Sequence, residues 1–236
     1  MTAPTQWDLA RLRTLTRDHP WFRTAHAEES GPRFDGFALF NYTPWHLARE
    51  RDDLKYVSSL ILDFKKNDTS AVAAVCNLAR ATLTDLISTG VWKGKRLEGY
   101  ASDGYEWFGR DLIVAPSSAV GVGNIQTNAL AASLESLFEE DLDPDHPFNH
   151  SGYCLERHTA QGPSHLNKKT VDEHLGTIRI VPNATCKPWC GHTLPRYMVL
   201  DDVYTRGATF GACKKLLRDH NPTADVMGFF VSVTAY

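Results

Sequence analysis

The sequence predicts an α/β protein with a mostly parallel sheet and helices on both faces. One observation behind this prediction is the succession of strand, helix, strand and helix through the second half of the chain, which is typical of a parallel sheet with covered faces. Another is the run YMVLDDVYTRGATF at 197–210, in which an apolar strand leads through a turn into a helix. Open sheets of this class hold ligands at the carboxyl ends of their strands.

Composition places the chain among globular proteins of one domain. Its 236 residues are 42% hydrophobic and 22% charged, which allows a full core. The 25 basic and 28 acidic residues give a net charge of −3, so a broad nucleic-acid-binding surface is not expected. Because the N-terminus lacks an apolar signal segment and no apolar run is long enough to span a membrane, we expect a cytoplasmic protein with no membrane partner.

The five cysteines are an odd number spread along the chain, which favours reduced thiols over a disulfide framework. Cys186, Cys190 and His192 form a short cluster whose residue types suit Zn²⁺, although the sequence shows no clear fourth ligand. A metal site and an ordinary loop therefore both stay open for this segment.

Residues 1–100 are predicted from composition and periodicity alone. We expect an N-terminal elaboration that packs on a core at 101–236, the two forming one compact unit. Its expected elements are a short amphipathic helix at 7–15, a strand at 34–42, a helix at 51–66 and a second helix at 72–87 capped by Ser70. Lys65 and Lys66 either reach an anionic ligand or form a solvated helix end.

The core begins after a connection at 91–111 that is rich in glycine and aromatic residues. The elements expected next are a strand at 112–115, a helix from Ile125, a break at 141–150 and a strand at 178–181. The glycines near 121–123 do not have the G-x-G-x-x-G spacing, so the sequence does not meet the dinucleotide-binding fingerprint.

The run at 197–210 contains the chemically most informative residues. Asp201 and Asp202 place two carboxylates at the carboxyl end of the strand at 197–200, and a turn then leads into a helix that continues to 220. Backbone N–H groups at such a helix start form a phosphate site, and Gly207 lets the backbone approach a ligand closely. The alternative is an ordinary strand, turn and capped helix with solvated carboxylates.

A last strand is expected at 226–235.

The residues DDVYTRGAT at 201–209 resemble the PRPP-binding motif of type I phosphoribosyltransferases, where PRPP is 5-phosphoribosyl pyrophosphate. They are most similar to the ComF-like and amidophosphoribosyltransferase-like branch. The resemblance implies a Rossmann-like phosphoribosyltransferase sheet with a small hood or an N-terminal helical elaboration. It also implies that Asp201 and Asp202 hold the ribose hydroxyls and act with Mg²⁺, directly or through water.

The same resemblance places the 5-phosphate of PRPP in the turn formed by Thr205, Arg206, Gly207, Ala208 and Thr209. Arg206 departs from the family pattern, in which a second threonine stands at this position. The change removes a hydroxyl group and adds a cation beside the phosphate.

The resemblance covers 110–235 and is strongest at 197–213. It assigns the departing pyrophosphate to the loop after the strand at 112–115 and to a flexible lid. The candidate residues are Ser117 and Ser118 in the loop and Arg157, His158, Lys168 and Lys169 in the lid. Each of them either meets the pyrophosphate or belongs to an ordinary turn or a solvated polar face.

These features predict transfer of the phosphoribosyl group from PRPP to a nitrogen nucleophile, such as a nucleobase, with release of pyrophosphate. Mg²⁺ is the expected cofactor, PRPP and a small acceptor are the expected ligands, and a homodimer is expected because the family commonly dimerises. The alternative is a noncatalytic protein of the ComF type that binds PRPP or a nucleotide and serves regulation or DNA uptake. Arg206, and an arginine of the family pattern that is missing near Asn124, favour this alternative.

Overall fold

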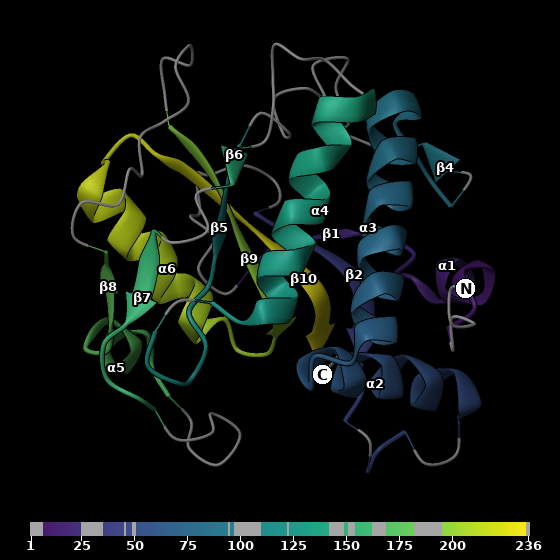
Figure 1. Cartoon of the computed structure of the whole chain (residues 1–236), viewed down its shortest axis with the longest axis horizontal. Coiled ribbons are helices and arrows are strands. Elements are labelled where there is room, and N and C mark those ends of the chain that lie inside the picture. The colour runs from purple at the N-terminus through teal and green to yellow at the C-terminus, as the bar shows by residue number, and fades with distance from the viewer. Residues whose placement is uncertain are drawn as a thin grey trace.

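Figure 1 shows a computed structural model of the chain, in which a central sheet separates two groups of helices. The residues that the structure describes are 7–24, 35–44, 46–48, 51–93, 95–96, 110–121, 123–141, 149–150, 154–161, 169–181 and 195–234.

Six strands within the described residues form the main sheet, in the order β1, β2, β10, β9, β5 and β6. All neighbours in this sheet run parallel except β1, which is antiparallel to β2 at one edge. The strand bounds are β1 Trp21–Phe22, β2 Gly36–Tyr42, β5 Asp111–Val114, β6 Asn149–His150, β9 Arg196–Tyr204 and β10 Asp225–Thr234. The predicted α/β class with a mostly parallel sheet is confirmed.

Within the described ranges, four helices cover one face of the sheet. They are α1 Leu9–Leu15, α2 Asp52–Lys65, α3 Thr69–Thr89 and α4 Ile125–Asp141, and a short hairpin of β3 Val91–Trp92 and β4 Lys95–Arg96 follows α3. Their buried apolar side chains form one core cluster with Met198, Leu200 and Phe229 of the sheet. Phe229 lies in this core stacked on Phe37.

The other face carries α6, Ala208–His220, together with a smaller unit. This unit consists of α5 Val171–Leu175 and a hairpin of β7 Leu155–Arg157 and β8 Ile178–Ile180. Phe210, Cys213 and Leu217 of α6 pack in a second core cluster with Tyr197 and Val199 of β9. Alternate residues of β9 therefore face opposite helical layers, as expected for a strand buried on both sides.

Several elements differ from the sequence prediction, most of them by one to three residues at an end, and β6 lies within the break predicted at 141–150. The strand predicted at 197–200 continues to Tyr204, because its residues pair with β10 as far as Val233. The N-cap of α3 is Asp68 rather than Ser70, since the Asp68 carboxylate accepts a hydrogen bond from the N–H of Ala71 at 3.0 Å. The hairpin of β3 and β4 lies within the predicted connection at 91–111.

The first hundred residues contribute directly to the main sheet. β2 pairs with the centre of β10, and the register places Phe37 beside Phe229. A buried ion pair joins the same regions, because the ammonium of Lys214 in α6 lies 3.5 Å from the carboxylate of Asp35. That carboxylate also accepts hydrogen bonds at 2.6 Å from the N–H and the hydroxyl of Thr24. These contacts fix the N-terminal segment on the sheet.

The cysteines only partly follow the expectation of reduced thiols. Cys76 and Cys213 are free and buried, whereas Cys154 is disulfide-bonded. The predicted zinc cluster at Cys186, Cys190 and His192 lies outside the described residues. Among the helices that the structure describes, none has both the length and the apolar character needed to cross a bilayer.

Candidate functional site

The carboxyl ends of β5 and β9 lie side by side and place their polar residues at one edge of the sheet. Val114 pairs with Leu200, and the N–H of Ala115 donates to the carbonyl of Leu200 at 2.9 Å. β5 ends there, whereas β9 runs on to Tyr204, so Asp201 and Asp202 extend past the last residue of β5. The structure thus brings together the carboxylate pair, the loop after β5 and the N-terminus of α6 (Figure 1).

Asp201 and Asp202 leave β9 on opposite faces of the sheet, because consecutive side chains of a strand alternate. Asp202 meets the α2 layer, where the ammonium of Lys65 lies 3.6 Å from its carboxylate. Asp201 meets the α6 layer and interacts electrostatically with Arg157 and Cys213. Each carboxylate also accepts a hydrogen bond from the next backbone N–H, at 2.8 Å for Asp201 and 2.6 Å for Asp202.

Burial, and after it the neighbouring charge of Asp202, together raise the pKa of the Asp201 carboxyl to about 7. The N–H of Asp202 and the cations Lys65 and Arg157 lower this pKa, but burial prevails. A carboxyl group that titrates near neutral pH at a strand end is typical of a functional site.

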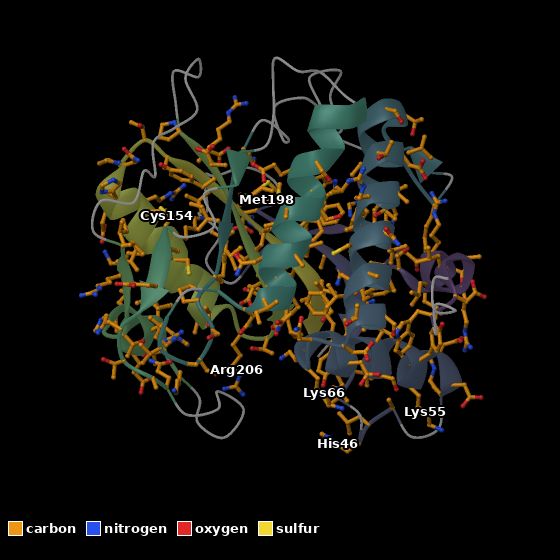
Figure 2. All side chains as sticks on the ribbon, viewed as in Figure 1. His46, Lys55, Lys66, Cys154, Met198 and Arg206 are labelled. Atoms are coloured by element: carbon orange, nitrogen blue, oxygen red, sulfur yellow. The ribbon has the colours of Figure 1, made fainter. Side chains whose placement is uncertain are left out.

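The turn after β9 leads directly into α6. Thr205 and Arg206 are exposed, and Figure 2 shows Arg206 at the same lower edge of the molecule as Lys66. Gly207 is the N-cap of α6, and no side chain caps the helix. The first N–H groups of α6, at Ala208 and Thr209, therefore have no intrahelical partner and can donate to an anion.

Glycine is required at position 207 for two reasons. Its φ angle is +73°, a left-handed conformation that other residues adopt at a cost. A Cβ atom there would also lie 2.6 Å from Cζ of Tyr204. The turn can therefore keep its shape only while residue 207 has no side chain.

We expect Gly207→Ala to lower the free energy of unfolding by about 1 to 3 kcal/mol, because it combines left-handed strain with overlap on the Tyr204 ring. Urea unfolding followed by circular dichroism measures the change. Gly176→Ala is the matched control, since the φ of Gly176 is −66° and its nearest Cβ contact would be 3.6 Å. Equal stability of the Gly207→Ala variant and the wild type would contradict this account of the turn.

The loop after β5 is held against the β7 hairpin rather than standing free. Gly121 and Arg157 exchange two backbone hydrogen bonds of 2.8 Å, and the N–H of Gln161 donates to the carbonyl of Ser118 at 2.9 Å. Ser117 is half-buried and Ser118 is exposed. The segment predicted as a lid therefore contacts the segment predicted to bind pyrophosphate.

The four predicted lid residues do not form one group of cations in the structure. Arg157 is only 2% exposed and points into the interior, whereas the resemblance implies a cation that reaches over the ligand. His158 is exposed and its ring interacts with the hydroxyl of Thr159. Lys169 is half-buried before α5, and Lys168 lies outside the described residues.

Lys65 belongs to the site, although the sequence did not distinguish a ligand contact from a solvated helix end. It is the last residue of α2, and the packing of α2 on the sheet brings it to Asp202. The only signal in the sequence was a pair of lysines at a helix end. Nothing local in the sequence relates 65 to 202, because the contact depends on tertiary structure.

Removal of this lysine should strengthen the binding of Mg²⁺ alone. We expect Lys65→Met to bind Mg²⁺ about two- to fivefold more tightly than the wild type, because a half-exposed ion pair contributes about 0.2–1 kcal/mol. Competition with Mn²⁺, observed by electron paramagnetic resonance, measures the affinity. Lys66→Met is the control, since Lys66 is more exposed and pairs with Asp63. Weaker binding by Lys65→Met would show that Lys65 supports the metal rather than competes with it.

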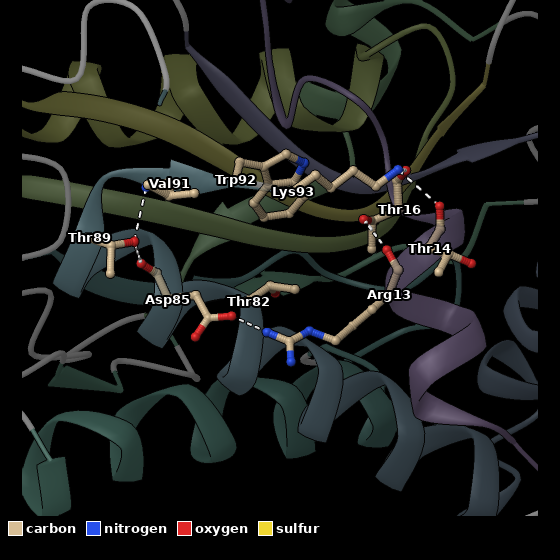
Figure 3. A pocket seen from close by; sticks show the side chains of 9 residues that line it. All are labelled: Arg13, Thr14, Thr16, Thr82, Asp85, Thr89, Val91, Trp92 and Lys93. Carbon is tan, nitrogen blue, oxygen red and sulfur yellow. Dashed lines mark hydrogen bonds and ion pairs between the residues drawn. The ribbon is translucent and has the colours of Figure 1, made fainter. Parts of the chain in front are cut away.

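A separate cavity of about 580 Å³ lies between α1, α3 and β3 (Figure 3). Its polar groups already have partners within the protein. The ammonium of Lys93 donates to the carbonyls of Thr14 and Thr16, the indole N–H of Trp92 donates to the carbonyl of Arg17, and Arg13 pairs with Asp85. This cavity therefore offers few free polar groups to a ligand, and the carboxylate edge remains the candidate site.

Comparison with protein families finds no match for the chain, and comparison with curated proteins also finds none. The sequence motif and the geometry of the carboxylate edge are therefore the features that indicate a function.

Proposed function

We propose that the protein binds PRPP and Mg²⁺ and transfers the 5-phosphoribosyl group to a nitrogen nucleophile, with release of pyrophosphate. One observation carries this proposal: two adjacent carboxylates on β9 are followed at once by a tight glycine turn and the uncapped N-terminus of α6. This arrangement presents acceptors for ribose hydroxyls next to donors for a phosphate group. It agrees with the type I phosphoribosyltransferase motif that the sequence resembles.

In this proposal the two ends of PRPP contact different parts of the edge. The 5-phosphate accepts hydrogen bonds from the backbone N–H groups of the turn at 205–209, and Arg206 adds an exposed positive charge there. The ribose hydroxyls donate to the carboxylates of Asp201 and Asp202. The pyrophosphate lies toward the loop with Ser117 and Ser118, which follows the neighbouring strand β5.

The residues present fit Mg²⁺. This ion prefers oxygen ligands and is commonly bound by one or two carboxylates together with substrate phosphates and water. Asp201 and Asp202 supply two carboxylates, and no group of three or more metal-binding side chains occurs among the described residues. When bound, Mg²⁺ would offset the negative charge of the pyrophosphate as it leaves.

The transfer breaks the bond between C1 of the ribose and the pyrophosphate oxygen, and the electron pair leaves with pyrophosphate. A nitrogen lone pair of the acceptor forms the new bond to C1, and the acceptor then loses a proton to solvent. Positive charge develops on the ribose ring between these events. The carboxylates of Asp201 and Asp202 stabilise that charge and orient the ring, so catalysis is chiefly electrostatic stabilisation and positioning.

The alternative is a protein that binds PRPP or a nucleotide without transfer. Two observations favour it. Arg206 replaces the usual threonine of the turn, and Arg157, a predicted lid cation, lies in the interior. A site without a closing cation would still bind the ligand but would exclude water less completely.

A pyrophosphate-release assay separates the two candidates. The protein is incubated with PRPP, Mg²⁺ and a panel of acceptors that includes ammonia, purine bases and pyrimidine bases. Release that requires both Mg²⁺ and one acceptor supports the transferase. Binding of PRPP, measured by calorimetry, without acceptor-dependent release supports the binding protein. Failure to bind PRPP contradicts the transferase and leaves only the binding of a nucleotide.

A further inference from the structure

Arg157 is a fully buried cation at the back of the loop that follows β5. Its side chain is among the largest fully buried side chains of the described residues, with 2% exposure. The guanidinium group donates from Nε to the carbonyl of Ser117 at 2.5 Å and from Nη1 to the hydroxyl of Thr177 at 2.5 Å. Its Nη2 lies 3.3 Å from Nδ1 of His174. A single side chain thus joins the loop, the β7 hairpin and α5.

The hydrogen-bond acceptors of Arg157 among the described residues are all neutral. Burial, and after it the positive charge of Arg157, lower the pKa of His174 to about 4, so the imidazole is uncharged at neutral pH. Within the part of the chain that the structure describes, Arg157 forms no ion pair, although Asp201 interacts with it at longer range. A buried charge with neutral partners is costly to the fold. The charge of Arg157 also produces a positive electrostatic potential behind the loop that follows β5.

The contacts of Arg157 also decide how the loop presents its backbone. The carbonyls of Ser117 and Gly121 accept hydrogen bonds from Arg157, and the carbonyl of Ser118 accepts one from Gln161. Both donor residues belong to the segment predicted as a lid. These carbonyls therefore face the hairpin. No described residue accepts from the N–H groups of Ser118, Ala119 or Val120, which remain available to an anion.

We propose that Arg157 is a positioning residue, which holds the carbonyls of the loop at 117–121 toward the hairpin and leaves its N–H groups free for pyrophosphate. This inference rests on the proposed function and deepens it. It assigns Arg157 a role different from that of a lid cation, because the guanidinium acts from the interior and does not touch the ligand.

Arg157→Lys tests the proposal, because lysine keeps the charge but lacks the planar set of donors that reaches three acceptors. Calorimetric titrations with Mg²⁺ use pyrophosphate as one ligand and ribose 5-phosphate as the other, at a temperature where both proteins are folded. We expect the affinity for pyrophosphate to fall at least tenfold and the affinity for ribose 5-phosphate, which would occupy the turn at 205–209, to stay unchanged. A purely structural role would weaken both or neither.

Arg179→Lys is the matched control, since Arg179 lies on the same hairpin, is exposed and pairs with Glu156 at 2.7 Å. It should bind both ligands as the wild type does. Should Arg157→Lys fail to fold, nuclear magnetic resonance of the wild type decides: pyrophosphate should shift the amide signals of Ser118, Ala119 and Val120. Unchanged pyrophosphate affinity in Arg157→Lys, or unshifted amide signals, overturns the role of Arg157 alone. A wild type that binds neither PRPP nor pyrophosphate overturns the proposed function as well.

Discussion

Asp201→Asn should be more stable than the wild type at pH 8, although it removes a residue of the proposed site. Ionisation of Asp201 is unfavourable in the folded protein because burial and the charge of Asp202 raise its pKa to about 7. The unfolded chain loses this proton near pH 4. Between about pH 4 and pH 7 the folded state therefore holds more protons than the unfolded state, and the stability contributed by this group falls as the pH rises.

The resulting difference between variant and wild type should be small at pH 4 and should reach its full value above pH 7. From the raised pKa we expect it to be on the order of 2 to 4 kcal/mol at pH 8. Asparagine keeps the oxygen that accepts from the N–H of Asp202, so the strand geometry is retained. Urea unfolding of both proteins at pH 4.5 and at pH 8 measures this difference. The lower pH is about half a unit above the pH at which the unfolded chain loses the proton, and the higher pH is about one unit above the raised pKa of the folded protein.

Asp219→Asn provides the control for this comparison, because Asp219 is an exposed residue of α6 that pairs with Lys215. Its effect should stay within about 0.5 kcal/mol at both pH values. If Asp201→Asn were less stable than the wild type at pH 8, the carboxylate would be supporting the fold, which would contradict a pKa raised by burial.

Replacement of both carboxylates should weaken ligand binding, although replacement of Asp201 alone should stabilise the fold. We expect Asp201→Asn/Asp202→Asn to bind PRPP in the presence of Mg²⁺ at least about a hundredfold more weakly than the wild type. Each asparagine removes a charge that would attract the metal and an acceptor that would hold a ribose hydroxyl, and charge-assisted hydrogen bonds contribute about 1.5–3 kcal/mol each. Calorimetric titration with PRPP and Mg²⁺ measures the loss.

The double variant distinguishes a binding defect from a folding defect, because its stability at pH 8 should not be lower than that of the wild type. Asp63→Asn is a suitable second control, since Asp63 is a carboxylate near the same edge that pairs with Lys66 and not with Lys65. Equal PRPP affinity in the double variant and the wild type would remove Asp201 and Asp202 from the site.

The sequence predicted the local parts of this site well. The strand, turn and helix at 197–220 follow from apolar patterning, a glycine and a helix start that are adjacent in the chain. The helix predicted at 208–220 has the observed bounds. β9 was predicted too short because aspartate is rare in strands. Pairing with β10 outweighs that preference.

The nonlocal parts could not be predicted in this way. The contact of Lys65 with Asp202 depends on how α2 packs, and the sequence of α2 only indicates which of its faces is apolar. The sequence places Arg157 in a segment predicted as a flexible lid, and charge runs usually face solvent. Its burial follows from the antiparallel contact with Gly121 and from the packing of α5, which brings Thr177 and His174 to its guanidinium group.

A calorimetric titration of PRPP into the wild-type protein at pH 7.5, with and without Mg²⁺, tests whether the carboxylate edge binds PRPP. The proposal predicts saturable binding that requires Mg²⁺, because Asp201 and Asp202 would hold the metal, directly or through water, where it would offset the negative charge of the PRPP phosphates. Absence of binding in the presence of Mg²⁺ would contradict it. The turn at 205–209 would then have a different ligand, and nucleotides would be the next compounds to titrate.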